Sequence, residues 1–168
     1  MNQTPPKRIA IIGLPGSGKS TFASKLGKLL NVPVHHLDRH MFEPDGKKRD
    51  KQDLLEIQKE MLSEEAWIIE GCALSSLEMR FKEADTLIYF HYSWLLCFWR
   101  LVKRLFNHDK AFGGLRTVNL ELLKYIWTFD REKGPAIEAL REKYPQVEFC
   151  VFRNPKEAEE YWSSHASR

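Results

Sequence analysis

The stretch GLPGSGKS at residues 13–20 is the part of the sequence from which the fold follows most directly. It fits the pattern G-x-x-x-x-G-K-S/T at every fixed position. Glycines in this pattern let the main chain curl, so that successive backbone N–H groups point into one concavity and hold phosphate oxygens. A lysine adds a full positive charge for the β- and γ-phosphates, and the serine hydroxyl is suited to Mg²⁺. The stretch therefore predicts a Walker A loop, whose nucleotide-binding residues are Gly13, Gly16, Ser17, Gly18, Lys19, Ser20 and Thr21.

The flanks of this stretch have the order that such a loop requires. Residues 9–12 are a short apolar run rich in β-branched residues, which is typical of a buried parallel strand. The start of the following helix, near Gly18, directs the positive end of its dipole toward the same phosphates. Apolar residues recur along that helix at helical spacing, at Phe22, Leu26, Leu29 and Leu30.

Further short apolar runs alternate with helical patterns along the chain. They are expected as strands at residues 34–37, 67–69, 86–90 and 147–152. Strands that alternate with helices predict the fold class α/β, with a parallel sheet and helices on both faces. In such sheets ligands bind at the carboxyl ends of the strands, near the point where the strand order reverses.

The second half of the chain carries specific helix signals. The helical pattern at residues 119–143 contains the Gly-Pro pair 134–135, so we expect an interruption there. The sequence NPKE at residues 154–157 places a capping asparagine, a proline at the first helical position and a glutamate at the third. A final helix is therefore expected to begin at this point.

Composition and charge are those of an ordinary globular protein. The 168 residues carry 26 Lys and Arg against 23 Asp and Glu, a net charge of +3, which suits polyanionic small molecules such as nucleotides. Three widely spaced cysteines without a CxxC pair argue against a disulfide framework or zinc site, and favour a reducing cytoplasm. No signal peptide is expected, and the longest uncharged run, 86–99, is too short to span a bilayer. We expect one cytoplasmic domain over residues 1–168, without membrane attachment.

The residues just past the strands are the candidates for chemistry. Asp38 follows an apolar strand, where a carboxylate can help to hold Mg²⁺ or accept a proton from an attacking hydroxyl; the alternative is a capping or turn aspartate. Glu70-Gly71 closes the third strand, and Gly71 either lets a substrate approach the backbone or only forms a turn. Arg80 is suited to clamp an acceptor substrate, or to pair with Glu83 on the surface.

Basic residues gather between the fourth strand and the long helical pattern. Arg100 and Arg104 are four residues apart, so they share one face of a helix. Phosphoryl transfer needs such donors, because charge on the moving group must be neutralised where water is excluded. The alternatives are a solvated basic face, or a nucleic-acid or membrane surface, since tryptophans interleave with the charge. The other basic residues of this region are Lys103, Lys110 and Arg116.

With these motifs in place, the chain resembles the adenylate-kinase-like P-loop kinases, and within them the bacterial topology modulation proteins. The resemblance extends over nearly the whole chain, although only the first motif is highly specific. It rests on the GLPGSGKS loop, His36-Leu37-Asp38, Trp67-Ile68-Ile69-Glu70-Gly71, Arg80, Ala84-Asp85-Thr86, Arg100-x-x-x-Arg104 and Arg153-Asn154-Pro155.

The resemblance implies a three-layer P-loop NTPase fold, a five-stranded parallel sheet with a helical lid at about residues 94–134. It implies that Arg100 packs on the adenine ring and that Arg104 reaches phosphate. Arg153 and Pro155 would line the other side of the adenine, and Asp38 and Arg80 would lie on the acceptor side.

The chain departs from this family pattern at the end of the fourth strand. Related proteins often have a metal-binding aspartate there, whereas this chain has His91, so metal binding would depend on Ser20 and Asp38. The histidines at positions 35, 36, 40 and 91 lack metal-ligand spacing, and we interpret them as packing or polar contacts.

The sequence and the resemblance together predict an ATP-dependent phosphotransferase of the nucleoside-monophosphate or small-molecule kinase type, with ATP and Mg²⁺ as cofactors. One alternative is a nucleotide-binding regulator without turnover, linked to DNA topology. The other is a GTPase switch, but the chain contains neither the D-x-x-G nor the N-K-x-D segment of such proteins. No DNA-reading motif occurs, so direct nucleic-acid binding is an open alternative only. The sequence does not predict the oligomeric state.

The expected roles at the site divide into catalysis, acceptor binding and metal binding. The catalytic residues would be Lys19, Asp38, Arg100 and Arg104. The acceptor would contact Asp38, Gly71 and Arg80, and the metal ligands would be Ser20 and Asp38.

Overall fold

A parallel sheet forms the centre of the molecule. The computed structural model describes residues 6–43, 45, 47–73, 76–106 and 120–166, without the side chains of residues 104–106, 165 and 166. Its five-stranded sheet has the order β2-β3-β1-β4-β5, and every neighbouring pair is parallel. The predicted α/β class and five-stranded parallel sheet are therefore confirmed. The strands are β1 (Arg8–Gly13), β2 (Val34–His36), β3 (Trp67–Glu70), β4 (Thr86–Phe90) and β5 (Glu148–Phe152).

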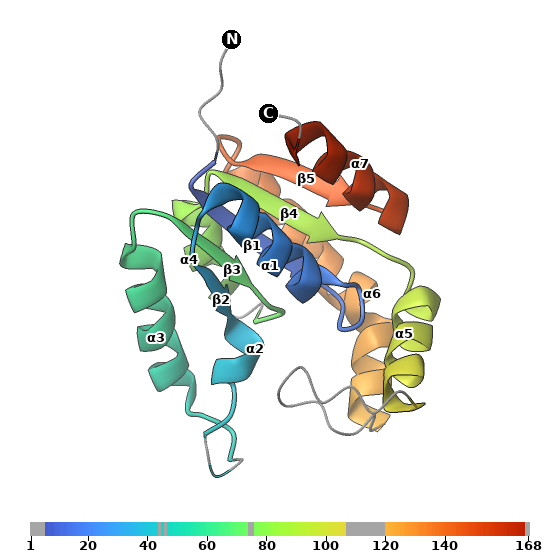
Figure 1. Cartoon of the computed structure of the whole chain (residues 1–168). Coiled ribbons are helices and arrows are strands. Elements are labelled where there is room, and N and C mark those ends of the chain that lie inside the picture. Colours follow the sequence, from blue (N-terminus) through green and yellow to red (C-terminus); the bar gives the residue numbers. More distant parts are fainter. Residues whose placement is uncertain (1–5, 44, 46, 74–75, 107–119, 167–168) are drawn as a thin grey trace.

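Helices cover both faces of this sheet. Figure 1 shows α1 and α7 on one face and α4 and α6 on the other, which gives the three layers. On the first face, the ring of Phe22 in α1 lies 6.0 Å from the rings of Tyr161 and Trp162 in α7. The helices are α1 (Lys19–Leu30), α2 (Leu37–His40), α3 (Lys51–Ser63), α4 (Leu77–Glu83), α5 (Trp94–Phe106), α6 (Leu120–Lys143) and α7 (Pro155–Ala166).

The core explains why α1 is held firmly against the sheet. Residues 9–12 of β1 are fully buried, as their apolar run indicated. The ring of Phe22 makes edge contacts with Phe90 of β4 at 5.3 Å and with Phe152 of β5 at 5.6 Å. These contacts fix the helix, and with it the loop at residues 13–18 that precedes it.

The topology places that loop at the crevice of the sheet. β1 lies between β3 and β4, and the chain leaves β1 toward β2 on one side before it returns to β4 on the other. The strand order therefore reverses beside the carboxyl end of β1, which is where open α/β sheets bind ligands.

The second strand is shorter than its apolar run suggested. β2 ends at His36, and residues 37–40 form the single turn α2. Leu37 is completely buried, so its apolar character reflects packing of this turn against the core. Asp38 consequently lies on a helical turn beyond the strand end.

The expected interruption of the long helix at residues 134–135 is wrong. α6 runs without a break from Leu120 to Lys143, with Pro135 inside it. Proline removes one backbone donor and its ring crowds the preceding turn. Pro135 is exposed, so water can satisfy the freed carbonyl, while Phe129 and Ile137 hold the helix to the core on either side.

The capping signal at residues 154–157 is confirmed. α7 begins at Pro155, and the Oδ1 of Asn154 accepts a hydrogen bond from the backbone N–H of Glu157 at 3.2 Å. The Glu157 carboxylate in turn accepts from the backbone N–H of Arg153 and from Nδ2 of Asn154, both at 2.7 Å. These bonds satisfy donors at the start of α7 and fix the loop after β5.

Of the helices in the described part of the chain, none is long and apolar enough to cross a membrane. Cys97 is buried and Cys72 and Cys150 are half-buried, and all three are free thiols.

Candidate active site

The loop between β1 and α1 curls as its glycines require. The backbone N–H of Ser17 donates to the carbonyl oxygen of Leu14 at 3.2 Å, which closes a turn. Gly18 is the N-cap of α1, in a left-handed conformation. The first N–H groups of a helix have no partner within the helix, so the start of α1 offers donors and a positive dipole end to an anion.

Gly16 lies where the loop touches α5. Its φ is +84°, and a Cβ atom there would come within 2.5 Å of the carbonyl oxygen of Cys97. Only glycine combines this φ with so close an approach of two backbones. The loop and α5 therefore pack as one unit.

Lys19 carries the central charge of the site. Lys19 is 4% exposed, and its Nζ donates a long hydrogen bond of 3.5 Å to the carbonyl oxygen of Leu14. Burial opposes the charged form, but the surrounding Cys72, Asp38 and Glu70 together raise the pKa of Lys19 above its ordinary value. The ammonium group is thus fully charged at neutral pH.

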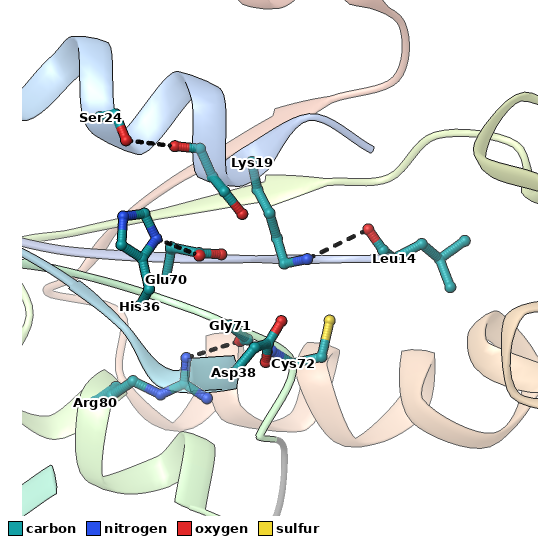
Figure 2. Close-up of polar contacts among 10 residues, drawn as sticks. Leu14, Lys19, Ser24, His36, Asp38, Glu70, Gly71, Cys72 and Arg80 are labelled. Atoms are coloured by element: carbon teal, nitrogen blue, oxygen red, sulfur yellow. Dashed lines mark hydrogen bonds and ion pairs between the residues drawn. The ribbon is translucent and has the colours of Figure 1, made fainter. Parts of the chain in front are cut away.

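Glu70 is a buried carboxylate at the end of β3, 1% exposed. Its Oε1 lies 2.6 Å from Nδ1 of His36. Burial would raise the pKa of Glu70, but the hydrogen bond from His36 and the charges and hydroxyl of Lys19 and Ser20 lower it. Its Oε2 has no hydrogen-bond partner within the described residues, although the Ser20 hydroxyl lies close. Figure 2 shows the Glu70 carboxylate between His36 on the left and the end of Lys19 on the right.

Asp38, from α2, is the second carboxylate near Lys19. Its Oδ1 accepts a long hydrogen bond of 3.4 Å from the backbone N–H of Cys72. Gly71, with φ +146°, makes room for it, because a Cβ atom there would lie 2.9 Å from Cβ of Leu37 and 3.1 Å from Oδ1 of Asp38. The predicted residues Asp38 and Gly71 are therefore brought together beside Lys19.

The surface pairing of Arg80 with Glu83 is wrong. Arg80 is completely buried, and its guanidinium donates to the carbonyl oxygens of Gly71 at 3.1 Å and Ala73 at 2.7 Å. Glu83 instead lies 3.7 Å from Arg8. Burial lowers the pKa of Arg80 to about 10, although the charges of Asp38 and Glu70 act in the opposite direction, and the group remains protonated. In Figure 2 Arg80 approaches Gly71 from below and supports the turn that carries it.

A cleft of about 900 Å³ opens beside the loop. Of the predicted nucleotide-binding residues, Gly16, Ser17, Gly18, Lys19, Ser20, Thr21, Arg100 and Pro155 line it. Gly13 lies at the base of the loop, where its carbonyl oxygen accepts a hydrogen bond from Sγ of Cys72. The lining also includes side chains that the sequence did not single out for this role, namely Phe22, Lys25, Tyr92, Lys103, Glu159 and Trp162.

Arg100 connects α5 to the loop. Its Nη1 donates to the carbonyl oxygen of Ser17 at 3.0 Å, and its guanidinium lies 5.7 Å from the centre of the Tyr92 ring. Arg104 follows one turn later in α5, but its side chain lies outside the described residues, as do residues 107–119 with Lys110 and Arg116. Of the expected lid at residues 94–134, the structure therefore describes α5 and the first part of α6.

Arg153, which the resemblance placed beside the adenine, does not line this cleft, and His91 makes packing and polar contacts outside it. Arg153 is exposed at the start of α7 and is not among the lining residues. His91 stacks on Tyr89, with ring centres 5.1 Å apart, and its Nε2 lies 3.3 Å from a carboxylate oxygen of Asp130. The buried carboxylate near Ser20 lies at the end of β3 instead.

Glu70 is the functional candidate that the sequence analysis left out of its site list. The sequence signal for Glu70 was the same as for Asp38, namely a carboxylate at the end of an apolar strand. What was missing was the strand order, which puts β3 directly beside β1, so that Ile11 pairs with Glu70.

The residues present fit a magnesium ion of the kind that accompanies a nucleotide. Among the residues that the structure describes, no group of three or more His, Cys, Asp or Glu side chains could hold a metal by itself. Magnesium beside a nucleotide needs only one or two protein ligands, because phosphates and waters supply the rest. The Ser20 hydroxyl and Oε2 of Glu70, which has no hydrogen-bond partner among the described residues, meet that need, and the Asp38 carboxylate also lies near Lys19.

Comparison with solved structures identifies the fold. The chain is similar to shikimate kinase from Bacteroides thetaiotaomicron, with a TM-score of 0.57 and 20% identity over 97% of this chain and 95% of that one. This chain therefore shares the fold of that kinase. It is also similar to shikimate kinase from Acinetobacter baumannii in complex with shikimate, with a TM-score of 0.61 and 15% identity over 95% and 90%. A gluconokinase from Sinorhizobium meliloti 1021 gives a TM-score of 0.55 and 17% identity over 98% and 96%.

At the level of sequence, no family model and no curated protein matches the chain. The fold is thus established by likeness in shape to these kinases, and the roles of individual residues rest on the geometry described above.

Proposed function

We propose that this protein is an ATP-dependent small-molecule kinase that uses Mg²⁺. The observation that carries the proposal is the position of Lys19, a buried and charged ammonium group at the end of a glycine loop, with the carboxylates of Glu70 and Asp38 near it. A triphosphate offers the loop and Lys19 the negative charge for which both are suited.

The cleft is suited to the nucleotide half of the reaction. The loop N–H groups and Lys19 would hold the β- and γ-phosphates, and Ser20 with Glu70 and Asp38 would hold the magnesium ion. When bound, magnesium neutralises charge on the phosphates and orients them. Arg100 would cover the nucleotide from α5, with Arg104 reaching phosphate as part of a lid. The adenine base would lie against Pro155, with Arg153 at the entrance of the cleft.

The other side of Lys19 is suited to the acceptor. An acceptor hydroxyl oxygen would attack the γ-phosphorus while the bond to the β,γ-bridging oxygen breaks, and its proton would pass to the Asp38 carboxylate. Gly71 allows the acceptor close to the backbone, and Arg80 holds the Gly71–Ala73 turn from behind. The acceptor would be a small molecule with a hydroxyl or phosphate group.

We also propose that, among the P-loop kinases, the protein is most similar to the bacterial topology modulation proteins. This similarity rests on the motifs His36-Leu37-Asp38 and Trp67–Gly71. The alternative of a regulator without turnover was favoured by His91 at the end of the fourth strand. Glu70 beside Ser20 weakens that argument, because a carboxylate is present at the end of β3, on the other side of β1.

The proposal is tested by measuring ADP release from ATP across a panel of small hydroxyl and phosphate acceptors. Lys19→Met should lower acceptor-dependent turnover about a hundredfold or more, because a charge that stabilises the transferring phosphoryl group is lost. Lys28→Met, at the exposed end of the same helix, is the matched control and should turn over like the unchanged protein. Full transfer by the Lys19 variant would refute the proposal, and nucleotide binding without any acceptor-dependent release would favour the regulator.

A further inference from the structure

The His36–Glu70 pair joins two neighbouring strands at the site. In the β2–β3 pairing, His36 lies directly opposite Glu70, so their side chains emerge on the same face of the sheet. Nδ1 of His36 is 2.6 Å from Oε1 of Glu70, and the side chains are 12% and 2% exposed. A short hydrogen bond to a carboxylate in such shielded surroundings is strong and orients both groups.

The direction of this bond follows from the chemistry of the carboxylate. Glu70 is a carboxylate beside the Lys19 ammonium group. An ionised carboxylate only accepts hydrogen bonds, so Nδ1 of His36 must carry the proton that is shared. The bond engages Oε1 and leaves Oε2 without a hydrogen bond of normal geometry to any residue that the structure describes, on the carboxyl group that faces Lys19 and Ser20.

The neighbouring histidine offers an internal contrast. Consecutive strand residues point to opposite faces, so His35 leaves the sheet away from Glu70. Its Nε2 lies 3.0 Å from the carboxylate of Glu64, which is 40% exposed and belongs to the end of α3. The two pairs have the same chemistry on one strand, but only the His36 pair faces Lys19.

We propose that His36 is a positioning residue that holds Oε1 of Glu70, so that Oε2 is aimed at the Ser20 hydroxyl as a direct or water-mediated ligand of the magnesium ion. The inference rests on the proposed function, because it concerns the metal that would accompany the nucleotide. The role fits the general behaviour of residues behind a metal ligand, which fix its orientation and change metal affinity when they are removed.

The test measures how much magnesium strengthens nucleotide binding. Calorimetry gives the dissociation constant of the non-hydrolysable analogue AMP-PNP with Mg²⁺ and with EDTA, and their ratio is the magnesium enhancement. His36→Leu removes the donor at nearly constant shape and should lower this enhancement about tenfold. His36→Asn keeps an N–H donor close to the place of Nδ1 and should retain most of it. His35→Leu is the control on the same strand and should leave it unchanged.

The readout separates positioning from general damage. Loss of folding would weaken AMP-PNP equally with Mg²⁺ and with EDTA, whereas loss of Glu70 orientation weakens only binding with Mg²⁺. If His36→Leu does not fold, His36→Ala and His36→Asn supply the same comparison. The inference, but not the proposed function, would be overturned if the magnesium enhancement were unchanged in His36→Leu, or if His36→Asn lost as much of it as His36→Leu. No AMP-PNP binding by the unchanged protein would overturn it together with the proposed function.

Discussion

At the scale of single residues, the site is a set of buried charges that depend on one another. Lys19, Glu70 and Arg80 are each no more than 4% exposed. Burial of an isolated charge is costly, so such groups persist only when opposite charges and hydrogen bonds surround them. Asp38 and Glu70 supply the negative charge, and Lys19 and Arg80 the positive charge, around the turn at residues 71–73.

Arg80 gives the residue-scale prediction. Arg80→Met removes two hydrogen bonds to the carbonyl oxygens of Gly71 and Ala73 and takes a positive charge away from Asp38 and Glu70. We expect the free energy of unfolding to fall by about 3 kcal/mol, as for other buried charges that lose their partners. Urea unfolding monitored by circular dichroism measures this change.

The control for Arg80 lies on the same helix. Lys82 is exposed, so Lys82→Met should change the free energy of unfolding by less than about 0.5 kcal/mol. Equal stability of the Arg80 and Lys82 variants would mean that the buried guanidinium does not support the turn.

At the scale of elements, the site is fixed by contacts between its loop and two helices. α1 packs through Phe22 onto β4 and β5, and α5 packs its backbone against Gly16. α6 packs on α5 and, through Lys143, reaches Glu78 of α4. The element that bears Arg100 is thus tied to the rest of the molecule through α6.

The continuity of α6 gives the element-scale prediction. Gly134 lies inside the helix, and a Cβ atom there would meet nothing within 4 Å. Gly134→Ala should therefore raise the free energy of unfolding by about 0.5–1 kcal/mol, because alanine loses less backbone entropy on folding. Thermal unfolding checks this, and a lower melting temperature would show that the helix is interrupted at residues 134–135 after all. Gly16→Ala is the contrasting variant, since the Cβ would meet the backbone of Cys97 and stability should fall.

At the scale of the whole molecule, the nucleotide would join parts that are far apart in the sequence. The cleft is lined by the loop after β1, by Arg100 and Lys103 of α5 and by Ala158 and Trp162 of α7. A ligand that binds this arrangement, and not the unfolded chain, stabilises all of it together.

The prediction at this scale is a dependence of stability on nucleotide. AMP-PNP with Mg²⁺, at a hundred times its dissociation constant, should raise the free energy of unfolding by about 2.7 kcal/mol. A rise in melting temperature with ligand concentration measures this effect in the unchanged protein. The Lys19→Met variant, which should bind the triphosphate weakly, is the control, and an equal rise in that variant would contradict the placement of the phosphates at Lys19.

The sequence by itself determined the features that depend on neighbouring residues. Examples are the glycine loop, the alternation of strands and helices and the cap of α7 at Asn154. Each of them depends on residues that lie within a few positions of one another. Local backbone preferences and hydrophobic periodicity decide these features, so a single sequence suffices.

The tertiary structure alone decided which side chains meet. His36 and Glu70 are separated by 34 residues, and they pair because β2 lies beside β3 in this sheet. The burial of Arg80 depends in the same way on how α4 packs, and the survival of Pro135 inside α6 depends on its exposure and on the flanking core contacts. No local pattern carries this information, because long-range packing sets the partners, dielectric surroundings and charge of each group.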